Sequence, residues 1–228
     1  MSRKMKISER AAGAKAASIR LAAVKTDVKN AALTEIARAL QERSAEIVAA
    51  NARDLAAARK ADLAAPLLKR LKFDDAKLAD VCAGLHSLIR LPEPVGRTLS
   101  SIELDDGLEL YRVSCPIGVI GVVFESRPDA LVQISTLCLK SGNACLLKGG
   151  SEAAHTNRIL AETIALASES AGLPAGWIQL LETRQDVAEM LALDEQIDLI
   201  VPRGSNEFVR HIMTHTNIPV LGHADGIC

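Results

Sequence analysis

The sequence predicts an α/β protein in which long helices and a β-hairpin precede a five-stranded parallel sheet. Residues 7–60 are rich in alanine, contain no proline and repeat apolar residues at intervals of three and four, as amphipathic helices do. Two runs of alternating apolar residues flank Asp105–Asp106–Gly107, which is typical of a hairpin. After Pro116, short apolar runs alternate with helical stretches, and this alternation is typical of a parallel sheet.

The helical part is expected to consist of several segments. A break is expected near residues 26–27, where Thr26 or Asp27 could cap the second segment. Shorter helices are expected over residues 63–71 and 74–90, and the second of these ends at Leu91–Pro92 because a proline disfavours the helical conformation of the residue before it.

The sheet and its crossover helices are expected in the second half of the chain. We divide the sequence into a helical part (1–97), a hairpin (98–115), the parallel sheet (116–221) and a short final segment (222–228). The predicted strands cover residues 117–124, 144–148, 177–181, 197–201 and 218–221, and the predicted helices cover residues 129–140, 152–171, 186–193 and 206–214.

The composition argues against several functional classes. The chain carries 27 Lys+Arg and 28 Asp+Glu, and its only aromatic residues are 1 Trp, 1 Tyr and 3 Phe. This balance disfavours a nucleic-acid-binding protein. No apolar run approaches the ~18 residues of a membrane span, and no apolar core of a signal peptide follows the first residues. A cytoplasmic protein without a membrane or nucleic-acid partner is expected. Residues 1–72 carry a net charge of +9, which indicates either an anionic partner or, the reading we favour, solvated helix faces.

The cysteines give no indication of a metal site or a disulfide framework. No CxxC pair occurs and no histidine stands at ligand spacing, so no metal is expected and the thiols should be reduced. The five cysteines are Cys82, Cys115, Cys138, Cys145 and Cys228.

Three loops at strand ends carry candidate binding residues. Ligands of open parallel sheets bind beyond the carboxyl ends of the strands, and there the sequence has loops 125–129, 148–152 and 202–206. Each contains a cation together with glycine or serine, although turn geometry and capping alone would explain any one of them. Taken together they favour a dinucleotide or another phosphorylated ligand. Both the Gly-x-Gly-x-x-Gly fingerprint and the P-loop are missing from the sequence.

The motifs themselves resemble one family. The phrases ESRPDA, LKSGNA, LLKGGSEA, PRGSNEFV and PVLGHADGIC are similar to those of the gamma-glutamyl phosphate reductase (glutamate-5-semialdehyde dehydrogenase) family, a branch of the aldehyde dehydrogenase superfamily. The resemblance covers essentially the whole chain. It implies an aldehyde-dehydrogenase-like fold with a Rossmann-type sheet. It also implies an oxidoreductase of proline biosynthesis, which uses NADPH to reduce L-glutamate 5-phosphate to L-glutamate 5-semialdehyde with release of phosphate.

The resemblance also implies roles for individual residues. Lys148 stands where the superfamily contacts the adenosine ribose, and Ser151 stands where NAD-preferring relatives have a glutamate that would repel a 2′-phosphate. Ser126 and Arg127 stand where relatives have a Trp-Asn pair beside the reacting carbonyl, and Arg127 in place of the neutral Asn would suit an anionic acyl phosphate. The candidate cofactor-binding residues are Lys148, Gly149, Gly150, Ser151, Glu152, Arg203, Gly204 and Ser205.

The superfamily needs a nucleophilic cysteine thiolate, and the resemblance places it beyond the segment matched by PVLGHADGIC. The chain is therefore interpreted as the amino-terminal half of a reductase, with no catalytic residue of its own and no activity alone. Residues 222–228 would begin the crossover to a catalytic domain. The resemblance further implies a homo-oligomer bridged by the hairpin, and functional coupling to glutamate 5-kinase. The alternative is a non-catalytic module that binds NADP(H) or an acyl phosphate.

Overall fold

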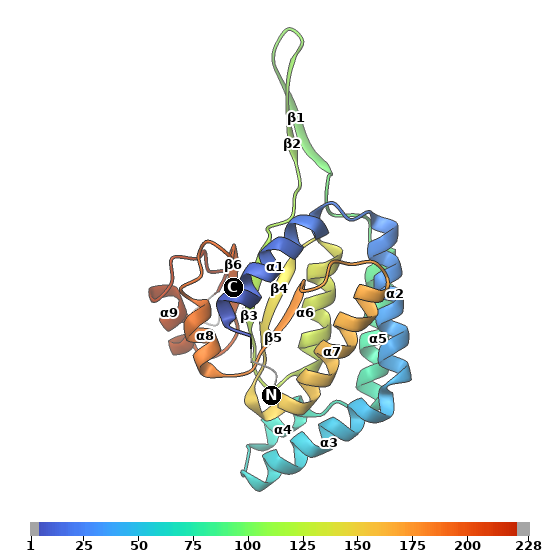
Figure 1. The fold of residues 1–228 in the computed structure, drawn as a ribbon, viewed down its shortest axis with the longest axis vertical. Coiled ribbons are helices and arrows are strands. Elements are labelled where there is room, and N and C mark those ends of the chain that lie inside the picture. Colours follow the sequence, from blue (N-terminus) through green and yellow to red (C-terminus); the bar gives the residue numbers. More distant parts are fainter. Residues whose placement is uncertain (1–4, 223–228) are drawn as a thin grey trace.

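The computed structural model describes residues 5–222 and confirms the α/β class (Figure 1). A short 3-10 turn at Ser151–Ala153 precedes the longest helix of the second half. The helices are α1 (Ile7–Ala22), α2 (Thr26–Glu42), α3 (Ser44–Lys60), α4 (Ala65–Leu71), α5 (Asp75–Arg90), α6 (Pro128–Lys140), α7 (Ala154–Ser170), α8 (Arg184–Met190) and α9 (Asn206–Thr214), and the strands are β1 (Thr98–Asp105), β2 (Leu108–Val113), β3 (Val119–Val123), β4 (Ala144–Lys148), β5 (Ile178–Leu181) and β6 (Leu199–Pro202).

Within residues 5–222 the parallel sheet has four strands in the order β5-β4-β3-β6, so the predicted count of five is wrong. The segment 218–221 contributes a single parallel bridge between Ile200 and Val220. The next ladder bond on its amino-terminal side would have to be donated by residue 219, which is a proline without an N–H. The pairing therefore cannot continue on that side of the bridge.

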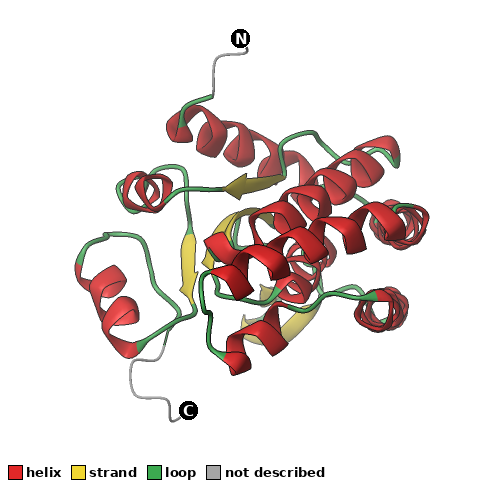
Figure 2. Ribbon diagram, turned by 90° about the horizontal axis from the view of Figure 1, so that it is seen from below, coloured by secondary structure: helices red, strands yellow, loops and turns green. Residues whose placement is uncertain are grey.

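Helices cover the sheet in layers (Figures 1 and 2). Helix α1 packs along β3, β4 and β5, while α6 contacts β4 and α7 contacts β5. Helices α2, α3 and α5 pack on α6 and α7 as an outer layer. Every residue of β3 and β4 is buried, as continuous apolar runs in the centre of a covered parallel sheet should be. Among the described residues, no helix is both long and apolar enough to cross a membrane.

The long helical stretch breaks twice, and the predicted cap at its first break is wrong. Helix α2 begins after Lys25, which provides no side-chain cap. The hydroxyl of Thr26 instead donates to Glu93, 2.8 Å away. A second break, which the sequence did not predict, occurs at Arg43 between α2 and α3. The predicted start of α5 is confirmed, because the Asp74 carboxylate accepts the backbone N–H of Lys77 at 3.2 Å.

The hairpin β1–β2 extends away from the rest of the molecule (Figure 1). Its turn is closed by Gly107 at φ +73°, a conformation that favours glycine. Every residue of both strands is exposed. The exposed large apolar side chains of the hairpin are Leu99, Ile102, Leu104, Leu108, Leu110, Tyr111 and Val113.

Candidate functional site

The three candidate loops begin side by side at the carboxyl edge of the sheet. Val123, at the end of β3, is paired with Lys148 of β4 on one side and with Pro202 of β6 on the other. The backbone continues this alignment, because Phe124 N donates to Lys148 O at 2.9 Å and Arg203 N donates to Val123 O at 2.8 Å. The loop after β3 therefore lies between the loops after β4 and β6. One rim of the sheet thus carries all three candidate loops.

In the central loop, Ser126 is buried and has a φ of +40°. Its backbone N–H and its hydroxyl both donate to Oε1 of Glu152, at 2.7 and 2.5 Å. Glu152, which the sequence analysis counted among the cofactor-binding residues, thus binds the neighbouring loop of its own chain. The two loops are joined through this one carboxylate.

Arg127 presents a half-exposed guanidinium next to this junction. Its Nη2 lies 3.1 Å from Oδ2 of the buried Asp129, in the first turn of α6. Lys77 of α5 approaches the same oxygen at 3.9 Å. The sequence analysis did not single out Lys77 or Asp129, because the contact joins helices that are about fifty residues apart in the chain. Two cations around one carboxylate leave a net positive charge that suits an anionic ligand.

The loop after β4 begins with a buried lysine. The side chain of Lys148 donates to Gly149 O. Burial lowers its pKa below the ordinary lysine value, while the carboxylates of Glu152 and Asp186 oppose that shift. A Cβ at Gly149 would overlap the amide of Asn157, and one at Gly150 would overlap the carboxylate of Glu152. Gly149 is therefore required by the packing of buried neighbours, whereas Gly150 is required only for Glu152 to keep its present position.

The loop after β6 is open to solvent. Arg203, Gly204 and Ser205 are exposed, and the hydroxyl of Ser205 accepts the N–H of Phe208 at 3.3 Å as the N-cap of α9. A helix amino terminus beside an arginine favours an anion. Glu125, from the loop after β3, lies close to this loop. Its Oε1 is 3.3 Å from the position that a Cβ of Gly204 would occupy. Ser151, the remaining candidate residue, is exposed at the start of the 3-10 turn.

Helix α3 supports the site through Asp54, which the sequence analysis missed. This buried carboxylate accepts the backbone N–H groups of His155 and Thr156 at 3.2 and 2.8 Å and the hydroxyl of Thr156 at 2.6 Å. It therefore caps the first turn of α7 directly after the Lys148–Glu152 loop. In the sequence Asp54 resembles an ordinary polar residue of a helix face, so its position gave no local signal.

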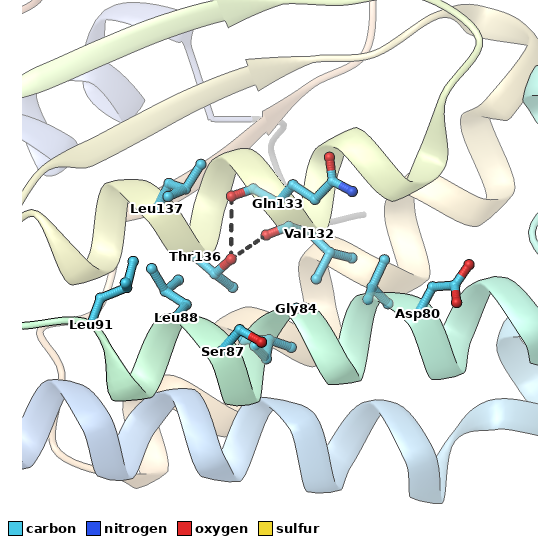
Figure 3. Close-up of a pocket in the computed structure, with 11 residues that line it drawn as sticks. Asp80, Gly84, Ser87, Leu88, Leu91, Val132, Gln133, Thr136 and Leu137 are labelled. Atoms are coloured by element: carbon cyan, nitrogen blue, oxygen red, sulfur yellow. Dashed lines mark hydrogen bonds between the residues drawn. The ribbon is translucent and has the colours of Figure 1, made fainter.

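A separate groove of about 360 Å³ lies between α5 and α6 (Figure 3). Its walls are mostly apolar, with Leu85 and Leu88 on α5 and Val132 and Leu137 on α6. None of the sequence-predicted site residues lines it. Among residues 5–222, no cluster of three or more His, Cys, Asp or Glu side chains could hold a metal ion.

Comparison with known proteins gives consistent matches over almost the whole chain. The sequence profile described as the aldehyde dehydrogenase family matches residues 2–221. A gamma-glutamyl phosphate reductase of Acetivibrio thermocellus is 66% identical over 224 residues, which are 98% of this chain and 52% of the relative.

Two crystal structures of proteins with that name are also similar. The Thermotoga maritima protein has a TM-score of 0.91 at 34% identity, over 95% of this chain and 53% of that chain. The Saccharomyces cerevisiae protein has a TM-score of 0.89 at 43% identity, over 98% of this chain and 58% of that chain. The chain thus spans about half the length of the relatives it matches.

Proposed function

The chain belongs to the aldehyde dehydrogenase family, and we propose that it forms the cofactor-binding part of an NADPH-dependent reductase of L-glutamate 5-phosphate. The products would be L-glutamate 5-semialdehyde and phosphate, as in proline biosynthesis. The similarity to gamma-glutamyl phosphate reductases over 98% of the chain supports this substrate. The observation that carries the proposal is the alignment of three loops with cationic residues on both sides of Val123.

The family implies a nicotinamide cofactor, and the rim fits its phosphates. Lys148 supplies a buried cation at the end of β4, and Arg203 supplies an exposed one at the start of α9. The α9 amino terminus, capped by Ser205, offers backbone dipoles that favour negative charge. Ser151, being neutral, leaves room for a 2′-phosphate and so favours NADPH over NADH. When bound, the cofactor would supply the hydride.

The residues of the central loop would bind the reacting group. Arg127 is held by Asp129 with its guanidinium half-exposed, and a fixed planar cation suits the oxygens of an acyl phosphate. Lys77, which lies 3.9 Å from the same carboxylate oxygen of Asp129, would add a second positive charge. Ser126 and Arg127 would thus contact substrate, whereas Lys148 and Arg203 would contact cofactor.

We propose that the nucleophilic cysteine lies outside this chain. Among the described cysteines, Cys115 and Cys145 lie before or at the start of their strands, at the edge of the sheet opposite to the candidate loops. Burial, together with the contact of its thiol with Cys138, raises the pKa of Cys145 well above the ordinary value, and burial raises the pKa of Cys82. A raised pKa reduces the thiolate fraction that nucleophilic attack requires. Cys228 lies outside the described residues.

The domain division and the partners are further parts of this proposal. Residues 1–97 and 116–221 would form the cofactor domain, the hairpin 98–115 would bridge subunits, and 222–228, mostly outside the described residues, would lead to the catalytic domain. A homo-oligomer, coupling to glutamate 5-kinase and a cytoplasmic location remain expectations. Co-purification with the kinase and imaging of a tagged full-length protein would test the last two.

A cofactor titration tests the binding part of the proposal. The chain should enhance and shift the fluorescence of NADPH, and Lys148→Met or Arg203→Met should weaken this binding about 10-fold or more, as the loss of a phosphate contact requires. Ser151→Glu should shift preference from NADPH toward NADH, whereas Ser101→Glu on the hairpin serves as the matched control. Absence of binding, or binding that ignores all three rim substitutions, would refute the assignment.

An activity assay separates the enzyme from the binding module. If the 228-residue chain alone reduced glutamate 5-phosphate, the proposed external nucleophile would be wrong. A longer natural form that includes the proposed catalytic part should be assayed as well. If it bound NADPH but did not reduce glutamate 5-phosphate, the non-catalytic alternative would replace the reductase.

A further inference from the structure

The central loop holds its serine in an unfavourable backbone conformation. Ser126 has a φ of +40°, and among the described residues the only other non-glycine with a positive φ is Asp62. Ser126 is also buried, with 5% of its surface exposed. A non-glycine residue in the left-handed region persists only where its surroundings hold it there. The neighbouring contacts should therefore show which group does so.

That group is the carboxylate of Glu152. One oxygen, Oε1, accepts both the backbone N–H and the hydroxyl of Ser126, at 2.7 and 2.5 Å. The two residues are separated by 26 positions in the chain and lie on the loops of adjacent strands β3 and β4. Charge-assisted hydrogen bonds of this kind are stronger than neutral ones. The side chain of Glu152 therefore holds Ser126 in its strained conformation through two hydrogen bonds.

Gly150 allows Glu152 to take this position. A Cβ at residue 150 would overlap the carboxylate group of Glu152. Any other residue would push the carboxylate away from the site it occupies beside Ser126. Gly150, Glu152 and Ser126 thus serve one contact.

We infer that Glu152 is a positioning residue that fixes the Ser126–Arg127 segment, and that it is not a cofactor ligand. The backbone of residue 126 sets the direction from which Arg127 leaves the loop, and Asp129 then binds the guanidinium from α6. The role of Arg127 in substrate binding rests on the proposed function, whereas the contact between Glu152 and Ser126 does not. The oxygen of Glu152 that accepts two hydrogen bonds from Ser126 is already used within the chain.

Hydrogen exchange tests the contact directly on the 228-residue chain. In Glu152→Ala, the amide of Ser126 should exchange at least 10-fold faster than in the unmodified chain. Glu152→Gln should stay within about 3-fold of the unmodified rate, because its amide oxygen can still accept both bonds. Amides in the centre of β4 should keep their protection in both variants and so report that the fold is intact. Unchanged exchange at Ser126 in Glu152→Ala would overturn the inference.

Two further measurements distinguish positioning from cofactor contact. The rate at which phenylglyoxal modifies Arg127 should change at least 3-fold in Glu152→Ala and return toward the original rate in Glu152→Ala/Ser126→Gly, because glycine adopts a positive φ without support. The NADPH affinity of Glu152→Ala should not fall more than 2-fold below that of the unmodified chain. A loss of affinity with unchanged loop exchange would make Glu152 a cofactor ligand. If the unmodified chain bound no NADPH, the proposed function would fail, and the exchange and modification rates would still decide the role of Glu152.

Discussion

Gly149 shows how tightly the protein packs beneath its candidate site. A Cβ at this position would overlap the amide of Asn157 and lie 3.1 Å from Cε2 of Phe124. Both neighbours are almost fully buried, at 3% and 4% exposure, so neither can move aside freely. Oδ1 of Asn157 already lacks a hydrogen-bond partner among the described atoms, which leaves little reserve for a rearrangement.

Gly149→Ala should therefore destabilise the chain by about 1–3 kcal/mol, the usual cost of overpacking a core. Urea unfolding followed by circular dichroism would measure this change. Gly13→Ala is the matched control, because Gly13 is exposed within α1 and a Cβ there would meet no atom within 4 Å. The control should raise stability by ~0.5–1 kcal/mol. Equal stability of the two variants would contradict this account of Gly149.

Single residues differ in how far the sequence could predict them. The cap at Asp74 follows from its own helix, and the structure confirms it. Gly149 and Gly150 were predicted to be cofactor-binding residues, and the structure places Asn157 and Glu152 beside them. A local pattern identifies that glycine is needed, but the side chain that needs it becomes adjacent only after folding.

At the scale of elements, a helix or strand was predicted correctly where the local residue pattern indicates it. The alternation of apolar runs predicted β3 to β6, and the helices between them, because burial imposes those periodicities. The break at Arg43 was not predicted, because helix-forming residues stand on both sides of it. The prediction of a strand over 218–221 was wrong because Pro219 interrupts the ladder of hydrogen bonds, although the apolar pattern continues through it.

Glu93 joins α2 to the segment between α5 and the hairpin. Its carboxylate accepts hydrogen bonds from Lys29 at 2.6 Å, from Thr26 at 2.8 Å and from the N–H of Val95 at 3.1 Å. Lys29 is itself buried, at 2% exposure. Burial would raise the pKa of Glu93, but the hydrogen bonds from Lys29 and Thr26 outweigh it and hold the pKa below the ordinary glutamate value.

Because the pKa of Glu93 is depressed in the folded protein, its ionised carboxylate stabilises the folded state fully at pH values above the ordinary glutamate pKa of ~4.3. This stabilisation is lost as the pH falls through the pKa that Glu93 has in the folded protein. The free energy of unfolding should thus decrease from about pH 5 toward pH 3. In Glu93→Gln this decrease should be smaller, and stability at pH 7 should be lower by about 2–4 kcal/mol because Lys29 loses its counter-charge. Urea midpoints at several pH values would measure both effects. Glu46→Gln, on the exposed side of α3, should leave the pH profile unchanged, and an identical profile for Glu93→Gln would refute the interpretation.

At the scale of the whole molecule, the hairpin is the feature that the rest of the chain does not explain. Two strands with no further partner are marginally stable in water, and their exposed apolar side chains form a surface of the kind that binds another protein. Ile102 and Leu110 are directly paired across the two strands and are 55% and 53% exposed. The next pair along the ribbon, Glu103 and Glu109, is polar. At these two successive pairs, one face of the ribbon is therefore apolar and the other is polar.

If a second copy of the chain covers the apolar side, as proposed, sedimentation at micromolar concentrations should show an oligomer. Ile102→Ser/Leu110→Ser should then dissociate it, because the pair supplies buried apolar area, whereas Glu103→Gln/Glu109→Gln should not.

The ends of the ribbon already meet, since Ser114 N donates to Arg97 O at 2.9 Å and Gly96 N donates to Ser114 O at 2.8 Å. A variant in which a two-residue turn replaces residues 98–113 should therefore fold, with a Tm within about 3 °C of the original, and be monomeric. A chain that is monomeric with its hairpin intact, or an oligomer that survives removal of the hairpin, would show that another surface or another protein is the partner.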